Sequence, residues 1–384
     1  MILTNVFGIP IEFLFFAATL LGIAFFHARN LEIAIGGLLL IVAYKLGFQH
    51  LDISQHLQHE WRLLVNLLGL LLGFAVLAKH FEESGVTEWL PRWLPSNWMG
   101  GFILLVMVGV LSSFLDNIAA AIIGGVIAKK LYKGRVSVGY LAAIVAAANA
   151  GGAGSVIGDT TTTMMWVAGV PALVVAEAAI AAVVAIAFSG IFASRAQERF
   201  QPLKIESVAN FRLDYARLLI VVLIIVATIL ANIWLDFPAV GLWAALVVGA
   251  FFRPTHWKEM QTAWRGAVFL IALVLSASLM PVDTLPAPSW QSSFALGFVS
   301  AFFDNIPLTA LALYQGGYDW GILAFAVGFG GSMLWFGSSA GVALSGKHPQ
   351  IKNTWVWIKE GWHVIVAYVL GFFVMLATVG WHPG

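Results

Sequence analysis

The stretch 149–166 reads NAGGAGSVIGDTTTTMMW and lies within an apolar run long enough to cross a bilayer, yet its composition opposes a continuous helix. Its four glycines each cost roughly 1 kcal/mol relative to alanine in a helix interior. Asp159 at membrane depth costs about 3 kcal/mol on insertion scales. Non-helical backbone at that depth is tolerated only where protein or a water-filled cavity surrounds it. The sequence therefore predicts a transmembrane helix interrupted at a polar site, and a glycine-rich packing seam with Asp159 in a short loop is the alternative.

The rest of the chain is equally apolar, which fixes the fold class. Hydrophobic residues make up 60% of the 384 residues and charged residues 10%, with a mean hydropathy of +0.91. These values predict an all-α polytopic integral membrane protein. A net charge of +1 gives no reason to expect a nucleic-acid partner, and the absence of cysteine excludes disulfides and thiolate metal sites.

Apolar runs near the length of one membrane span occur at 7–27, 31–48, 61–80, 138–167, 171–193, 214–235, 238–252, 266–280, 321–345 and 362–380. Two further stretches, 99–128 and 291–314, are apolar on both sides of a central Asp-Asn pair. Each half of these stretches is shorter than the roughly 20 residues that a transmembrane helix requires. We therefore expect ten spans and two re-entrant helical hairpins, with 138–167 and 321–345 as broken helices.

The two Asp-Asn pairs belong to a longer repeat. The segment SSFLDN at 112–117 recurs as SAFFDN at 300–305, 188 residues later, and each copy precedes a glycine-rich break. We interpret the chain as two repeats, 1–193 and 214–384, joined by a cytoplasmic linker at 194–213. Each repeat contains five transmembrane helices, one of them broken, and one hairpin.

Basic residues indicate how the repeats are oriented. The loop after the first hairpin carries Lys129, Lys130, Lys133 and Arg135, whereas the corresponding loop 315–320 carries none. By the positive-inside rule these equivalent loops lie on opposite faces, so the repeats are predicted to be inverted. The loops 194–213, 253–265 and 346–360 are also basic and predicted to be cytoplasmic, which places both termini outside.

Inverted repeats with paired broken helices are typical of secondary transporters, which bind substrate near the midplane where the breaks meet. The breaks and hairpin tips here carry an oxygen-rich set of candidate ion- and proton-binding residues: Asp116, Asn117, Asn149, Asp159, Thr160, Thr161, Thr162, Asp304, Asn305, Ser338 and Ser339. Hard cations take oxygen ligands, and carboxylates in a partly dry site hold protons more readily than in water. Competition of a cation and a proton for the same carboxylates is sufficient for antiport.

At these residues the sequence resembles the NhaD-type sodium/proton antiporters of the ion transporter superfamily, which also includes arsenite permeases and dicarboxylate transporters. The resemblance rests on SSFLDN at 112–117, Asn149 ten residues before Asp159 in GDTTT, the DN at 304–305 and the GSS at 337–339. It implies exchange of Na⁺ or Li⁺ for H⁺ in the bacterial inner membrane, with no cofactor. It also implies an elevator-like movement of hairpins and broken helices against a homodimeric scaffold. Two features depart from the family: the chain is short, and Pro307 follows the second DN.

Within that resemblance, the asymmetry between the halves suggests where the cation binds. The first break offers Asp159 where the second offers Ser338. An ionised carboxylate adds a full charge to a bound cation, whereas a serine supplies only a neutral oxygen. We therefore expect Na⁺ to bind at Asp116, Asn117, Asp159 and the hydroxyl of Thr161 or Thr162, with Asp304 holding or balancing a proton.

Other polar residues have competing interpretations. His50, His56 and His59 are predicted to lie in a polar external loop. We interpret this loop as a solvated amphipathic segment, and a metal-binding pair formed by His56 and His59 is the alternative. Glu177 lies in the span 171–193, where it either relays protons or faces water near the external end.

Two other functions remain open. An anion or oxyanion transporter of the same superfamily would use the helix N-termini, although Asp116 and Asp304 would repel its substrate. An intramembrane aspartyl protease would need two catalytic carboxylates that share a proton. That alternative explains neither the duplication nor the run of threonines, so we expect a transporter rather than an enzyme.

Overall fold

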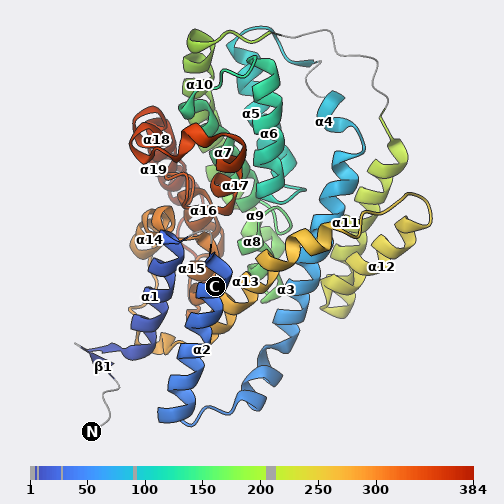
Figure 1. The fold of residues 1–384 in the computed structure, drawn as a ribbon. Helices are drawn as coiled ribbons and strands as arrows, with labels where there is room; N and C mark the ends of the chain where they lie inside the picture. Colours follow the sequence, from blue (N-terminus) through green and yellow to red (C-terminus); the bar gives the residue numbers. More distant parts are fainter. Residues whose placement is uncertain (1–4, 7, 27–28, 90–92, 205–212) are drawn as a thin grey trace.

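A computed structural model describes residues 5–6, 8–26, 29–89, 93–204 and 213–384, and these are predominantly helical (Figure 1). The elements up to the central linker are β1 (Asn5–Val6), β2 (Ile9–Pro10), α1 (Ile11–Phe25), α2 (Asn30–Phe48), α3 (Ile53–Glu82), α4 (Val86–Trp89), α5 (Trp98–Ser112), α6 (Asn117–Leu131), α7 (Val138–Ala153), α8 (Thr160–Val167), α9 (Ala172–Ala176) and α10 (Ala178–Phe200). The elements after it are α11 (Tyr215–Leu235), α12 (Pro238–Ala250), α13 (Glu259–Ser278), η3 (Val282–Thr284), α14 (Trp290–Phe302), α15 (Asn305–Gln315), α16 (Trp320–Gly330), α17 (Ser339–Lys347), η4 (Pro349–Lys352), α18 (Thr354–Glu360) and α19 (Trp362–Thr378).

The long helices confirm an integral membrane protein. Within the described residues, five helical segments are long and apolar enough to cross a membrane: α2, α3, α9 together with α10, α11, and α13. The pair α18 and α19, bent by 59° at Gly361, forms a sixth if it is counted as one span. Two other runs that we expected to be single spans, 7–27 and 238–252, form the shorter helices α1 and α12.

The predicted breaks are present in both halves of the chain. The run 138–167 forms α7 and α8, separated by residues 154–159, and the run 321–345 forms α16 and α17, separated by residues 331–338. The stretches 99–128 and 291–314 form the helix pairs α5–α6 and α14–α15, each with a short non-helical tip at its Asp-Asn pair. The order of helix pair and broken helix therefore occurs twice.

The two sets also make the same local contacts. A Cβ added at Gly151 of α7 would lie 1.9 Å from the carbonyl oxygen of Gly109 in α5, and one added at Gly330 of α16 would lie 2.3 Å from that of Gly297 in α14. In both pairs the helix backbones therefore lie closer together than they could if either glycine were a larger residue. Small residues permit this close approach between helices in membrane proteins.

Hydroxyl groups repeat the pattern beside those glycines. Ser112 donates a 2.6 Å hydrogen bond to the carbonyl of Ala148, and Ser300 donates one of 2.7 Å to the carbonyl of Val327. In both halves, therefore, the first helix of the pair is hydrogen-bonded to the helix that precedes the break.

The two helices that precede the breaks form the centre of the molecule. Every residue of α7 is buried, and so are all residues of α16 after Trp320. The two helices pack against each other, and α5, α10, α14 and α19 surround them (Figure 1). Because alanine and glycine dominate α7, its neighbours approach close to its backbone.

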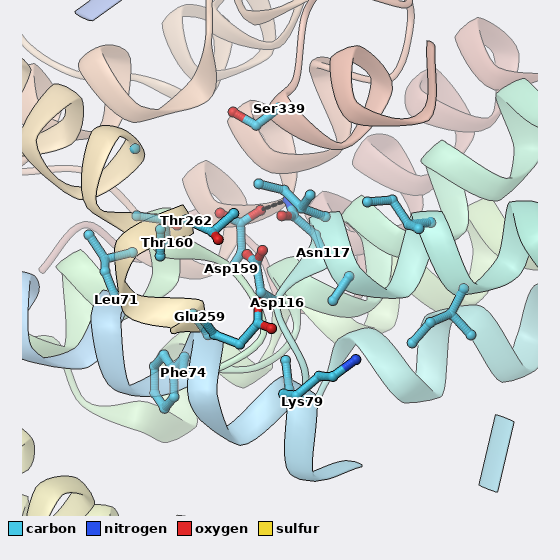
Figure 2. Close-up of a pocket in the computed structure, with 18 of the residues that line it drawn as sticks. Leu71, Phe74, Lys79, Asp116, Asn117, Asp159, Thr160, Glu259, Thr262 and Ser339 are labelled. Atoms are coloured by element: carbon cyan, nitrogen blue, oxygen red, sulfur yellow. Dashed lines mark hydrogen bonds between the residues drawn. The ribbon is translucent and has the colours of Figure 1, made fainter. Parts of the chain in front are cut away.

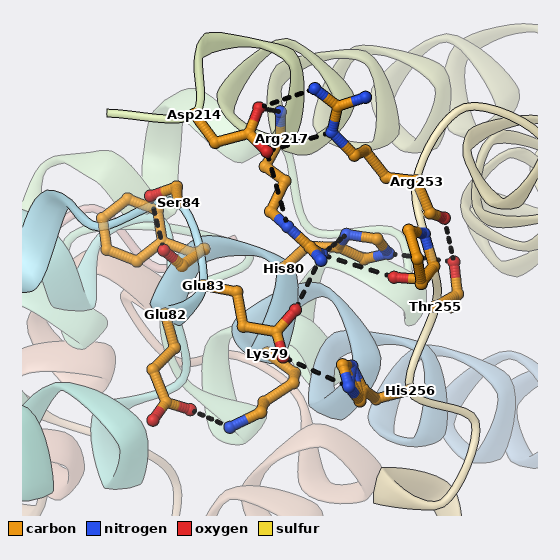
Figure 3. Close-up of polar contacts among 12 residues, drawn as sticks. Lys79, His80, Glu82, Glu83, Ser84, Asp214, Arg217, Arg253, Thr255 and His256 are labelled. Atoms are coloured by element: carbon orange, nitrogen blue, oxygen red, sulfur yellow. Dashed lines mark hydrogen bonds and ion pairs between the residues drawn. The ribbon is translucent and has the colours of Figure 1, made fainter. Parts of the chain in front are cut away.

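A separate group of helices packs beside this core. α3 contacts α11, α12 and α13, and α13 also contacts α2 and α15 (Figure 1). Where α3 ends and α11 begins, Arg217 pairs with Glu83 at 2.8 Å, and Arg253 donates hydrogen bonds of 3.0 and 3.3 Å to Asp214 (Figure 3). Asp214 also accepts hydrogen bonds from the backbone N–H groups of Ala216 and Arg217, which caps α11.

Two boundaries and one short element differ from the predictions. α3 begins at Ile53 because Asp52 caps it through the N–H of Gln55 at 3.0 Å, so His56 and His59 lie in a helix rather than in a loop. α10 continues to Phe200, past the predicted end of the span at residue 193, and part of the predicted linker, 205–212, lies outside the described residues. The short pair β1–β2 near the N-terminus was not predicted.

Candidate ion-binding site

Four helices begin at one cavity of about 750 Å³. The first residues of α6, α8, α15 and α17 all line it: Asn117, Thr160, Asn305 and Ser339. Each is preceded by the N-cap residue of its helix, and three of those four residues are aspartates: Asp116, Asp159 and Asp304, with Ser338 as the fourth. The two helix pairs and the two breaks thus converge on one place.

Asp159 has the most hydrogen-bond partners of the three aspartates. Its Oδ1 accepts hydrogen bonds from the N–H and the hydroxyl of Thr161, at 2.9 and 3.0 Å. Its Oδ2 accepts from the amide of Asn117 at 2.7 Å and from that of Asn305 at 3.4 Å. Asp159 is 3% exposed, so this carboxylate joins the first break to the tips of both helix pairs in the interior of the protein.

A second chain of hydrogen bonds begins at Asn117. Its Nδ2 also donates to Oδ1 of Asn149 at 3.1 Å, and Nδ2 of Asn149 donates to the hydroxyl of Ser332 at 2.9 Å. Asn149 and Ser332 are both fully buried, and they come from different halves of the chain. Ser332 was not among the predicted residues, since a single serine in an apolar segment gives no signal in a sequence.

Asp304 occupies, at the second helix pair, the position that Asp116 occupies at the first. Its Oδ1 caps α15 through the N–H of Ile306 at 3.2 Å, and its Oδ2 accepts a 2.9 Å hydrogen bond from the hydroxyl of Ser339. Ser338 caps α17 through the N–H of Gly341 at 3.3 Å. Asp304 therefore connects the second helix pair to the second break, as Asp159 and Asn117 do in the first half.

Asp116 faces the cavity. It precedes α6, but its side chain does not cap that helix, and it lines the same space as Asp159 (Figure 2). Farther along the cavity lie Lys79 and Glu82 of α3, Glu259 of α13 and Lys130 of α6. Lys79 pairs with Glu82 at 2.8 Å, whereas no described cation lies within ion-pair distance of Glu259.

The threonines after Asp159 have different roles. Thr160 lines the cavity, and the hydroxyl of Thr161 donates to Asp159. The hydroxyl of Thr162 donates instead to the carbonyls of Ser155 and Asp159, at 2.6 and 2.9 Å. Thr162 thus holds the non-helical backbone of the break in place, where non-helical carbonyls need such partners.

Of the predicted residues, Asp116, Asn117, Asp159, Thr160, Asn305 and Ser339 line the cavity directly. Asn149, Thr161 and Asp304 lie behind them and hydrogen-bond to them, whereas the hydroxyls of Thr162 and Ser338 contact backbone. Glu177 lies at the junction of α9 and α10 and does not line the cavity.

His56 does not line the cavity. Nε2 of His56 is 2.9 Å from the hydroxyl of Ser278, at the far end of α13. Within the described residues, no group of three His, Asp or Glu side chains could hold a metal ion.

A sequence profile of the citrate transporter family matches residues 2–330 of the chain. The chain belongs to this family. Among proteins with an assigned activity, Sodium/proton antiporter 1 of Arabidopsis thaliana is 27% identical over an alignment of 363 positions that covers 82% of this chain and 62% of the relative. Sodium/proton antiporter 2 of the same plant is 25% identical over 94% of this chain and 93% of its own length. The Na⁺/H⁺ antiporter NhaD of Alkalimonas amylolytica is 25% identical over 77% of this chain and 73% of its own length.

Membership of this family confirms that the chain is an ion transporter, and the similarity to NhaD antiporters agrees with the resemblance at the Asp-Asn pairs. The chain spans less than two thirds of Sodium/proton antiporter 1 but nearly all of Sodium/proton antiporter 2.

Proposed function

We propose that the chain exchanges Na⁺ or Li⁺ for H⁺ across the membrane, at the cavity where the four helices begin. The observation that carries this proposal is the charge balance there. Each helix N-terminus has the effect of roughly half a positive charge, so four contribute about +2. Three ionised aspartates contribute −3, which leaves about one negative charge for one monovalent cation.

The coupling follows from the same carboxylates. Asp116 and Asp159 line one cavity, so a bound cation and a proton compete for their oxygens. We assign the cation to Asp116, Asp159 and the amide oxygen of Asn117. A hydroxyl of Thr161 completes the set, or that of Thr160, which lines the cavity, in place of the expected Thr162. Asp304, bonded to Ser339, is ionised while the cation is bound and holds or balances a proton when the cation has left.

The wider transport cycle is also part of the proposal. The two similar sets of helices are inverted repeats, α5–α6 and α14–α15 are re-entrant hairpins, and the cavity lies near the midplane. The hairpins and broken helices move as one body against α3, α11, α12 and α13 in a homodimer. The protein lies in a bacterial inner membrane with both termini outside.

An anion substrate is the second candidate, because the matching family is described as citrate transporters and helix N-termini favour anions. Three aspartates of the chain already occupy those N-termini, however. A carboxylate substrate would meet like charges, and no arginine among the described residues lines the cavity, so the cation is favoured.

The test uses inverted vesicles that contain the protein and are energised to be acidic inside. A fluorescent probe of the pH difference should recover when Na⁺ or Li⁺ is added, and should not recover in vesicles without the protein. Absence of recovery with any alkali cation between pH 6 and 9, with folded protein present, would refute cation exchange. Uptake of labelled citrate under those conditions would favour the anion candidate.

A further inference from the structure

The cavity of about 750 Å³ is open toward one face of the protein. Its lining extends from Asp116 and Asp159 to Glu82, the last residue of α3, whose side chain is 53% exposed. α3 is long enough to cross a membrane, so its two ends lie on opposite faces. Within α3, all of which the structure describes, no residue before Leu71 lines the cavity. The cavity therefore reaches the face at which α3 ends and not the face at which α3 begins.

Buried apolar residues separate the cavity from the face at which α3 begins. Leu270 of α13 and Ile306 of α15 line the cavity and also belong to a hydrophobic cluster that continues beyond it. The cluster includes Leu67 of α3, Leu273 of α13 and Ala310 of α15, and none of these three has exposed surface. We call these five residues the seal. A charged ion cannot pass them while they are packed, because an apolar environment strongly disfavours an isolated charge.

The seal joins two groups of helices. α13 packs against both α3 and α15 (Figure 1), and all three helices contribute to the cavity lining. Leu67, Leu270 and Leu273 come from α3 and α13, whereas Ile306 and Ala310 come from α15. A transporter that works by alternating access exposes its site to each face in turn. To open toward the face at which α3 begins, α15 must separate from α3 and α13 at the seal.

One hydrogen bond crosses the same boundary just beyond the seal. The hydroxyl of Tyr314, one turn after Ala310 in α15, donates to Oε2 of Glu60 in α3 at 2.6 Å. Tyr314 also hydrogen-bonds to Ser278 at the end of α13, and Nε2 of His56 lies 2.9 Å from the Ser278 hydroxyl. Polar groups thus connect α15 to both α3 and α13.

The position of Glu60 is unusual. It is 6% exposed within a membrane-spanning helix, where an ionisable side chain is costly. Among the described residues, no cationic side chain lies within ion-pair distance of Glu60, and it does not line the cavity. Buried polar groups generally have hydrogen-bond partners, which explains why Tyr314 pairs with Glu60 but not why a carboxylate lies there. A hydrogen bond to a carboxylate is about twice as strong as one between neutral groups, so Glu60 strengthens the connection across the boundary.

We propose that the hydrogen bond between Glu60 and Tyr314 is a latch, which favours the state in which the cavity is open toward the end of α3. Separation at the seal breaks this bond and exposes both groups to water, so the opposite state lacks the latch. Loss of the latch therefore raises the population of the opposite state. The inference rests on alternating access, which the proposed function includes, but not on which ion is exchanged.

The test measures how often the seal opens. Ala310→Cys places a thiol within the seal of a chain that has no natural cysteine. An impermeant maleimide reaches it only while the seal is open, so the labelling rate from the face at which α3 begins measures the population of the open state. Tyr314→Phe removes the latch. The matched control is Tyr318→Phe, because the Tyr318 hydroxyl donates at 3.0 Å to Gln315, four residues or fewer from it, and does not cross the boundary.

We expect Tyr314→Phe to raise the labelling rate of Ala310→Cys about tenfold, whereas Tyr318→Phe should leave that rate unchanged. Adding Glu60→Gln to Tyr314→Phe should give no further increase, because both substitutions act on the same bond. A second reporter, Ala119→Cys in the cavity lining, should be labelled more slowly in Tyr314→Phe from the opposite face.

Three results would overturn the latch: an unchanged labelling rate of Ala310→Cys in Tyr314→Phe, an equal increase in Tyr318→Phe, or faster labelling of Ala119→Cys. The variants are compared at matched yields of folded protein and at constant ion concentrations. Because labelling requires no net transport, a failure of Na⁺ exchange in the vesicle assay would be distinguishable from a failure of the latch.

Discussion

The amide nitrogen of Asn117 donates a 2.7 Å hydrogen bond to Oδ2 of Asp159, which joins the tip of the first helix pair to the first break. The two residues are 42 positions apart in the sequence, so the contact depends on the tertiary fold. Asn305, from the other half of the chain, donates to the same oxygen. Asp159 is therefore the point at which both halves of the site meet.

Replacing that carboxylate should abolish exchange. Asp159→Asn removes both the negative charge and the titratable group, so we expect no Na⁺-dependent recovery in the vesicle assay. Ser338→Ala, at the corresponding position of the second break, removes a neutral hydroxyl and should mainly raise the KM for Na⁺. The two variants are compared at matched expression. If Asp159→Asn exchanges Na⁺ normally and Ser338→Ala is inactive, the cation binds at the second half instead.

Ser332 should stabilise the site through Asn149. Ser332→Ala leaves Nδ2 of Asn149 buried without its acceptor, which we expect to lower the free energy of unfolding by about 1 kcal/mol. The melting temperature in detergent should fall accordingly, and the KM for Na⁺ should rise. Ser345→Ala is the control, since the Ser345 hydroxyl donates only to a carbonyl of its own helix. Equal melting temperatures for the two variants would contradict this role.

The contact between α7 and α5 should tolerate no side chain at Gly151. A Cβ there would lie 1.9 Å from the carbonyl oxygen of Gly109, and neither backbone can move without displacing its helix. We expect Gly151→Ala to destabilise the protein by about 3 kcal/mol and to yield little folded material in size-exclusion chromatography. Gly346→Ala, whose added Cβ meets nothing within 4 Å, should fold normally. Normal yield of Gly151→Ala would mean that these helices are farther apart than described.

The ion pair between Asp214 and Arg253 should give a pH-dependent contribution to stability. The hydrogen bonds from Arg253 hold the pKa of Asp214 below its usual value. A carboxyl group with a lowered pKa in the folded state stabilises the protein above its unfolded pKa of about 4 and loses that contribution as the pH falls through the folded value. We expect Asp214→Asn to lower the melting temperature slightly between pH 6 and 8, and the difference from wild type to shrink below pH 4. A constant difference across this range would contradict the ion pair, and Asp283→Asn, at an exposed site, is the control.

Labelling of single cysteines tests the predicted inversion. The natural sequence has no cysteine, so Lys133→Cys and Ala287→Cys each provide one exposed thiol. An impermeant maleimide should label Lys133→Cys only from the cytoplasm. Ala287→Cys should be labelled only from outside, because its loop, 281–290, carries no Lys or Arg and is predicted to be external. Labelling of both from one face would exclude inverted repeats.

The amino-acid sequence by itself indicated a helical integral membrane protein and the polar residues that the structure brings together. Aspartates at membrane depth are costly, so Asp116, Asp159 and Asp304 are conspicuous in a chain with 10% charged residues. The breaks beside them were predictable for a similar reason, because several closely spaced glycines oppose a continuous helix. These signals are local, and each can be read within about twenty residues.

Only the tertiary structure decided which oxygens face the cavity and which hold the backbone. Thr160, Thr161 and Thr162 are identical in the sequence, yet they contact the cavity, Asp159 and backbone carbonyls respectively. Ser332 gave no signal because its role depends on Asn149, which lies 183 residues away along the chain. The convergence of four helix N-termini likewise depends on the packing of α7 against α16, since no local pattern specifies how separate helices approach one another.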